Sequence, residues 1–253
     1  MTQDPFRLDG KIALITGGNR GIGLAIAQAF GKAGARCMLT SRSRTDGLEE
    51  LVADSETYAW TEADLTDTAA PGKIVDATTE RFGTLDILVN NAGVAANGNF
   101  HEFGDEELEY IMGTNFTAPF RVARAAIRPM LDKGAGAIVN IGSISAVVAN
   151  HPQLQVAYNS SKAAIHQMTK VMAFEYASRG IRVNALAPGY VISDMTAGGI
   201  ANEEWNRIWT ANTPMGRFAR PEEMATCAQF LASDAASYVT GAILTADGGY
   251  TTH

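Results

Sequence analysis

Residues 12–23 have the sequence IALITGGNRGIG, and this stretch decides the fold. Its four apolar residues are typical of a buried strand, and the helical pattern that begins at Ile22 ends before Gly34. Between them, glycines permit a tight turn, a close approach of the backbone to a pyrophosphate, and close packing of helix on strand. The free N–H groups of the helix N-terminus favour an anion. A glycine-rich turn without a ligand is the alternative, but the position directly after the first strand favours dinucleotide binding.

Six further apolar runs have the length and composition of strands, and helical patterns separate them. These runs are residues 37–40, 57–60, 85–90, 137–141, 182–186 and 242–246. Strands joined through helices form a parallel sheet with helices on both faces. We therefore expect an α/β fold, a doubly wound seven-stranded parallel sheet, in a single domain over residues 1–253.

The widest interval without a strand signal is residues 193–236. We expect an insertion with two helices there, the second beginning at Pro221, where Glu222 and Glu223 favour the first turn. Residues 193–211 of this insertion are predicted to form a mobile substrate flap, because loops of this kind carry specificity.

Composition excludes several classes of function. With 46% hydrophobic and 19% charged residues the chain is typical of globular proteins. The 20 Lys and Arg against 27 Asp and Glu give a net charge of −7, which argues against a nucleic-acid partner. Cys37 and Cys227 are too few for a disulfide framework, and no apolar run reaches membrane-spanning length. We expect a cytoplasmic protein without a membrane partner, and without a metal site because no ligand cluster is present.

The spacing of the glycine loop resembles the T-G-x-x-x-G-x-G signature of the short-chain dehydrogenase/reductase family. Further motifs of that family follow in order: Asn90-Asn91-Ala92-Gly93, Tyr158-x3-Lys162, Pro188-Gly189 and Asp247-Gly248-Gly249. The resemblance runs from about Leu8 to Tyr250. It implies a Rossmann fold and an oxidoreductase that uses a nicotinamide dinucleotide.

Tyr158 and Lys162 lie one turn apart on one face of a predicted helix. A nearby ammonium lowers a tyrosine pKa from about 10 toward the working pH, so the phenol can exchange a proton with a carbonyl or alcohol oxygen. The resemblance implies a serine that orients the substrate carbonyl, and we choose Ser143, while Ser145 either lines the pocket or caps a turn. It also implies that Asn115 interrupts a helix and holds a proton-relay water, a helix cap being the alternative.

The end of the second predicted strand discriminates between the two nicotinamide cofactors. An acidic residue there would repel a 2′-phosphate, but this chain has Ser41 and Arg42, and Arg20 lies in the glycine loop. Guanidinium groups bind phosphate bidentately, so NADP(H) is predicted over NAD(H). Ser193 stands where the family usually has a threonine that binds the nicotinamide carboxamide. The complete cofactor site implied by the resemblance is Gly17, Asn19, Arg20, Gly21, Ile22, Gly23, Ser41, Arg42, Asp64, Leu65, Asn91, Ala92, Gly93, Tyr158, Lys162, Pro188, Gly189, Val191 and Ser193.

The expected reaction is hydride transfer between NADP(H) and a small ketone or secondary alcohol. Residues 150–153 resemble segments of polyol dehydrogenases and carbonyl reductases, and His151 and Gln153 are candidates to bind substrate hydroxyls, with a solvated loop as the alternative for His151. A 3-oxoacyl-carrier-protein reductase and a non-catalytic dinucleotide-sensing regulator remain as alternatives. The first is disfavoured because residues 132–137 carry little positive charge. The resemblance, together with apolar residues on more than one face of the helix after Tyr158, implies a homotetramer.

Overall fold

Seven parallel strands form the centre of the computed structural model, which describes residues 4–252. Their order across the sheet is β3-β2-β1-β4-β5-β6-β7, and every neighbouring pair is parallel. The strands are β1 (Ile12–Thr16), β2 (Arg36–Ser41), β3 (Tyr58–Glu62), β4 (Ile87–Asn90), β5 (Gly136–Ile141), β6 (Ile181–Pro188) and β7 (Ile243–Ala246). Each lies within one of the predicted runs or extends it by one or two residues. The predicted doubly wound α/β fold is confirmed.

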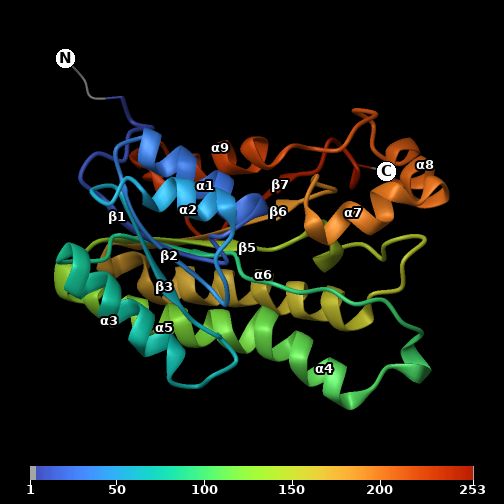
Figure 1. Cartoon of the computed structure of the whole chain (residues 1–253), viewed down its shortest axis with the longest axis horizontal. Coiled ribbons are helices and arrows are strands. Elements are labelled where there is room, and N and C mark those ends of the chain that lie inside the picture. The colour runs from blue at the N-terminus through green and yellow to red at the C-terminus, as the bar shows by residue number, and fades with distance from the viewer. Residues whose placement is uncertain (1–3, 253) are drawn as a thin grey trace.

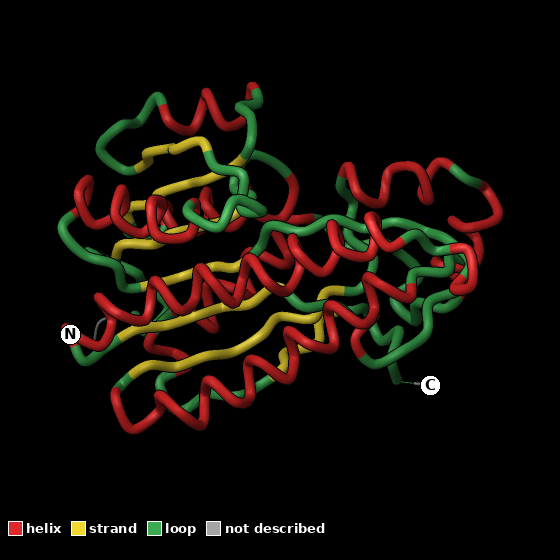
Figure 2. Tube along the Cα trace, turned by 90° about the horizontal axis from the view of Figure 1, so that it is seen from below, coloured by secondary structure: helices red, strands yellow, loops and turns green. Residues whose placement is uncertain are grey.

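Helices cover both faces of the sheet (Figure 1). One layer consists of α1 (Gly21–Lys32), α2 (Asp46–Val52) and α9 (Pro221–Ala232). The opposite layer consists of α3 (Ala70–Phe82), α4 (Asp105–Met112), α5 (Ala118–Lys133) and α6 (Val156–Tyr176). Figure 2, seen from the side of this second layer, shows helices lying over the strands and running roughly along them. Burial on both faces explains why the central strands are continuous apolar runs.

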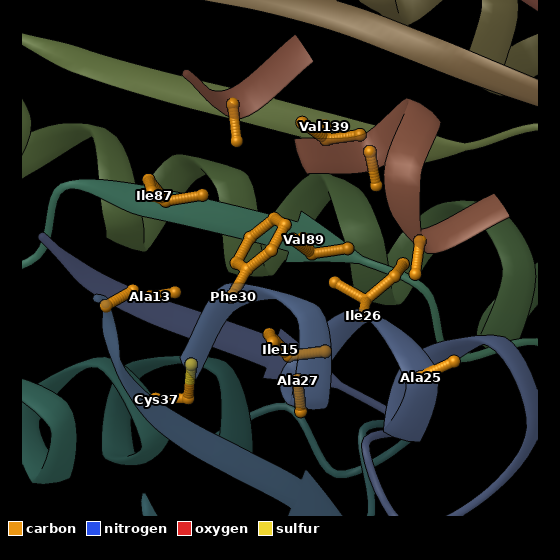
Figure 3. Packing of buried hydrophobic residues seen from close by; sticks show 14 of the residues in the cluster. Ala13, Ile15, Ala25, Ile26, Ala27, Phe30, Cys37, Ile87, Val89 and Val139 are labelled. Atoms are coloured by element: carbon orange, nitrogen blue, oxygen red, sulfur yellow. The ribbon is translucent and has the colours of Figure 1, made fainter. Parts of the chain in front are cut away.

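Alternate residues of each strand enter separate cores because successive side chains point to opposite faces. Ile15 and Val89 face α1, where Ile26 and Phe30 pack against them (Figure 3). Leu14 belongs to the second core, formed with α3, α5 and α6. These buried layers fix the sheet and thereby the positions of the loops at its carboxyl edge.

The order of the strands reverses between β1 and β4. The chain leaves β1 toward one side of the sheet and β4 toward the other, so the loops after these strands diverge. In open α/β sheets such a point opens a crevice at the carboxyl ends of the strands, where ligands bind. The glycine loop follows β1 and residues 91–93 follow β4, so both flank this crevice.

The insertion between residues 193 and 236, all described by the structure, has three α-helices rather than the two helices that we predicted. In addition to α9, it contains α7 (Asp194–Ala201) and α8 (Glu203–Ala211), which lie together beyond the end of the sheet (Figure 1). Two glycines in α7 obscure its helical pattern, but Thr196 and Ser193 form a capping box at its start. Asn202 then caps α8 by accepting a hydrogen bond from Trp205 N. In the described part of the chain, no helix is both long and apolar enough to cross a membrane.

Candidate active site

A cleft of about 930 Å³ lies at the carboxyl edge of the sheet. It extends from the ends of β2 and β3, past the glycine loop and the loop after β4, to the start of α6 and the helices α7 and α8. All but two of the predicted catalytic and cofactor-binding residues line it. The exceptions are Gly23 and Asn115, which lie behind its wall.

The glycine loop has the geometry of a phosphate cradle. Gly17 and Gly21 have φ angles of 65° and 54°, in the left-handed region that favours glycine. A Cβ on Gly23 would lie 2.2 Å from the carbonyl oxygen of Gly17, so Gly23 allows close packing and does not contact the cleft. The Asn91 amide donates to the backbone oxygens of Thr16 and Gly17, at 2.9 and 3.0 Å, and so ties the loop to the end of β4. These residues fit a dinucleotide pyrophosphate.

The three residues predicted to select the cofactor have partners within the protein. Arg20 forms an ion pair with Asp194 of α7 at 3.0 Å, and both side chains are about two-thirds exposed, at 64% and 69%. Arg42 donates to the hydroxyl of Tyr110 at 3.2 Å. The Ser41 hydroxyl donates to the Ser43 carbonyl oxygen at 2.7 Å, so its proton is already used. Both arginines are exposed and line the cleft, and Arg20 is attached to the insertion through Asp194.

Asp64 and Leu65 line the same end of the cleft. Hydrogen bonds from the backbone N–H and the hydroxyl of Thr66 lower the pKa of Asp64, and Arg42 contributes to the same effect. The Asp64 carboxylate is therefore ionised and fixed in orientation.

Ser143 and Tyr158 meet at the centre of the cleft. Ser143 follows β5, and its hydroxyl hydrogen-bonds with Tyr158 and lies 3.0 Å from the hydroxyl of Ser145, within hydrogen-bond distance. Burial raises the pKa of Tyr158, and the hydrogen bond from Ser143 opposes this only in part. The expectation of a lowered tyrosine pKa is thus wrong for this structure, because desolvation of the phenolate outweighs the hydrogen bond with Ser143.

Lys162 lies one turn further along α6. Its Nζ donates to the carbonyl oxygen of Ile141 at 2.8 Å and lies 5.7 Å from the centre of the Tyr158 ring. Burial lowers the pKa of Lys162 to about 8. A Cβ on Gly93 would lie 3.6 Å from this Nζ, so the loop after β4 passes directly over the lysine.

Asn115 lies in a π-helical segment, Gly113–Thr117, that joins α4 to α5. This confirms the predicted interruption of a helix, a geometry that recurs at functional sites. Its amide donates to the Val94 carbonyl oxygen and its oxygen accepts from the Val94 N–H, both at 2.8 Å. The amide also donates to Ser161 of α6 at 3.1 Å. The side chain therefore joins the loop after β4 to α6, and the alternative of a helix cap is wrong.

The far end of the cleft contains a network that the sequence did not reveal. Tyr190 stacks on Trp209 of α8, with ring centroids 4.2 Å apart. Gln153 donates to the Tyr190 hydroxyl at 2.8 Å and accepts from the Trp209 indole at 2.9 Å. His151, in contrast, is exposed and does not line the cleft, so its solvated alternative is the better one. In the sequence, the position of Tyr190 directly after the Pro188-Gly189 motif could have indicated this network.

Comparison with known proteins places this geometry in a family. A family model described as enoyl-(acyl carrier protein) reductase matches residues 17–251. Galactitol 2-dehydrogenase (L-tagatose-forming) of Cereibacter sphaeroides is 46% identical over 97% of both chains. The chain belongs to the short-chain dehydrogenase/reductase family. The motifs named in the sequence analysis are thus those of a family that nearly the whole chain matches.

Two further relatives have names that give other substrates. The 3-oxoacyl-acyl-carrier-protein reductase of Vibrio cholerae is 38% identical and covers 96% of this chain and 98% of its own. The crystal structure of a gluconate 5-dehydrogenase from Burkholderia cenocepacia in complex with NADP and tartrate has a TM-score of 0.93. It is 33% identical and covers 99% of this chain and 98% of that one. Polyol, sugar-acid and acyl-carrier substrates all occur in the names of these relatives.

Proposed function

We propose that this protein is an NADP(H)-dependent oxidoreductase that interconverts a secondary alcohol of a small polyol and the corresponding ketone. The observation that carries the proposal is the group of Ser143, Tyr158 and Lys162 in a cleft whose far end is polar and, in the residues that the structure describes, lacks cationic side chains. The polyol dehydrogenase among the relatives supports the substrate class.

The lack of cationic side chains among the described residues at the far end of the cleft supports a neutral substrate. A carboxylate or phosphate that is removed from water requires a cation or several N–H donors. The amides of Asn150 and Gln153 and the indole of Trp209 already donate within the protein. The polar and aromatic residues that line this end are Ser143, Ser145, Asn150, Gln153, Tyr190, Trp205 and Trp209. Such groups suit the hydroxyls and C–H faces of a polyol better than a sugar acid or an acyl thioester.

The chemistry requires a proton carrier beside the reacting oxygen, and Tyr158 has this role. The bound nicotinamide supplies the acceptor or donor of hydride. Tyr158 gives its proton to the carbonyl oxygen in reduction or takes one from the alcohol in oxidation. Ser143 hydrogen-bonds to that oxygen and orients it, and the Lys162 ammonium stabilises the phenolate form. Asn115 fixes the loop above Lys162 and provides the place for a proton-relay water.

The residues at the other end fit the cofactor. The N–H groups of the glycine loop and the start of α1 would hold the pyrophosphate. Arg20 and Arg42 would bind a 2′-phosphate, for which Arg20 must leave Asp194. Ser41, whose proton is used internally, would shape this site rather than donate to the phosphate. Ser193 would bind the nicotinamide carboxamide, and Val191, Pro188 and Gly189 would line its pocket.

We also propose a homotetramer in the cytoplasm, with residues 193–211 moving as a flap over the substrate. The exposed apolar side chains Val171 and Phe174 on α6, 53% and 92% exposed, support an assembly that covers this helix. The free thiols of Cys37 and Cys227 are compatible with a reducing compartment. Light scattering that gives a stable monomer would refute the assembly.

The test of the function is a substrate panel in which nicotinamide absorbance is followed with both cofactors. We expect reduction of NADP⁺ with hexitols, pentitols or tetritols, and little turnover with gluconate or with a 3-oxoacyl thioester in the reverse direction. Preference for the thioester would establish the carrier-protein reductase alternative. Binding of NADPH without turnover of any substrate would establish the non-catalytic regulator. Tyr158→Phe is the control that separates catalysis from contaminating activity.

A further inference from the structure

The hydrogen-bond network around Tyr190 has a single consistent orientation. The indole N–H of Trp209 can only donate, and it lies 2.9 Å from Oε1 of Gln153. The Gln153 oxygen must therefore face Trp209. Its NH₂ group must then face the Tyr190 hydroxyl, 2.8 Å away, and donate to it.

A second series of hydrogen bonds directs another amide, that of Asn150, at the Tyr190 hydroxyl. A backbone carbonyl can only accept, so the NH₂ group of Asn159 faces the oxygen of Val148 at 3.0 Å. The same NH₂ group lies 3.3 Å from Oδ1 of Asn150. The Asn150 NH₂ group is thereby directed at the Tyr190 hydroxyl, also at 3.3 Å. Two amides thus donate to one phenol oxygen.

The proton of the Tyr190 hydroxyl is left for another acceptor. Both neighbouring amides use the oxygen as an acceptor, so neither can receive that proton. Burial raises the pKa of Tyr190 well above its ordinary value, and the phenol stays protonated. Its ring is fixed by the stack on Trp209 and by an edge contact with the Tyr250 ring, whose centroid lies 5.4 Å from that of Tyr190. The Tyr250 hydroxyl is the nearby side-chain group that can receive the proton when the substrate does not.

We propose that Tyr190 is a specificity-determining residue that donates this proton to a substrate hydroxyl remote from the reacting carbon. The inference rests on the proposed function and deepens it. A site that is built to hydrogen-bond a hydroxyl discriminates against analogues without it, because its polar group is then left unpaired. The stacked rings of Tyr190 and Trp209 supply an apolar surface beside the donor. The site therefore selects polyhydroxylated alcohols over simple secondary alcohols.

The test compares Tyr190→Phe with Tyr250→Phe, each of which removes one hydroxyl and keeps a ring. The readout is the ratio of kcat/KM for the best polyol to kcat/KM for 2-butanol, with NADP⁺ saturating. We expect Tyr190→Phe to lower this ratio about tenfold, mostly through KM for the polyol, as for loss of one hydrogen bond. Tyr250→Phe is expected to leave the ratio at its wild-type value.

An unchanged ratio in Tyr190→Phe would overturn this proposal and leave the proposed function intact. An equal fall in Tyr250→Phe would also overturn it, because the proton would then serve the pair of tyrosines and not the substrate. A wild-type enzyme that oxidises no polyol would refute the proposed function and this proposal together. Should Tyr190→Phe not fold, Trp209→Phe provides the test: it frees the Gln153 amide to turn and accept the Tyr190 proton. The ratio must then fall, and an unchanged ratio refutes the proposal.

Discussion

Replacement of Lys162 by methionine should abolish turnover and yet stabilise the fold at neutral pH. Burial lowers the pKa of Lys162 from 10.5 to about 8. Since a tenfold change in a protonation constant is worth about 1.36 kcal/mol, the protonated lysine costs roughly 3 kcal/mol of folding free energy at pH 7. Methionine removes this cost but also the hydrogen bond to the Ile141 oxygen, worth about 1 kcal/mol. The expected net gain is about 2 kcal/mol.

The sign of the pH dependence follows from the two pKa values. Between pH 8 and 10.5 the unfolded chain binds more protons at Lys162 than the folded chain does, so the stability of the wild type rises with pH in this window. The Lys162→Met variant lacks this rise. Its advantage over the wild type should shrink by about 2 kcal/mol between pH 7 and pH 9.5.

Urea unfolding followed by circular dichroism, at one protein concentration and at both pH values, measures these differences. Lys170→Met is the matched control, because Lys170 lies on the same helix with an exposed side chain. It should change the free energy of unfolding little at either pH. A Lys162→Met variant that is less stable than the wild type at pH 7, or an advantage that is independent of pH, would refute the argument that burial of the ammonium is costly.

Four further substitutions test other parts of the protein. Tyr158→Phe should lower kcat by about 10²- to 10⁴-fold with the thermal midpoint retained, and a near-normal kcat would remove Tyr158 from the chemistry. Arg20→Ala should weaken NADPH roughly ten- to a hundred-fold in fluorescence titrations and leave NADH unaffected. Asp194→Asn, which frees Arg20, should tighten NADPH by about 1.4- to 5-fold, while the charge-matched Glu203→Gln should not; a weakening by Asp194→Asn would show that the ion pair assists binding. Burial lowers the pKa of His166 from 6.5 to about 4, so the wild type should lose stability as the pH falls through this window, and His166→Leu should lose less in acid unfolding curves.

Much of the fold could be predicted because the central strands consist mainly of apolar residues. A run such as residues 137–141 is typical of a strand that is covered on both faces of a parallel sheet, and β5 occupies it. The boundary of β4 shows the limit of this reasoning, since the apolar run begins at Leu85 but the strand begins at Ile87. Between them Asp86 is buried, where it accepts a hydrogen bond from Ile12 N and pairs with Lys133. Periodicity does not reveal a buried carboxylate of this kind.

The positions of the candidate site residues followed from ordered motifs, but their interactions did not. Tyr158 and Lys162 are adjacent on α6 as expected, yet the direction of the Tyr158 pKa depends on burial, which the sequence does not show. The contact of Trp209 with Gln153 joins residues 56 positions apart. It depends on how α8 packs over the cleft, and Gly199 allows this packing, because a Cβ there would lie 2.0 Å from the Trp209 ring. Tertiary contacts of this kind have no local signature.

The crevice between β1 and β4 also has a consequence for the evolution and engineering of this enzyme. Residues 17–66 build its nucleotide end, whereas residues 150–155 and the helices α7 and α8 build much of its other end. Each end can therefore acquire substitutions without a matching change in the other, so a new alcohol preference can arise on an unaltered cofactor site. The Arg20–Asp194 ion pair crosses this division, and mutations at position 194 should affect both traits at once.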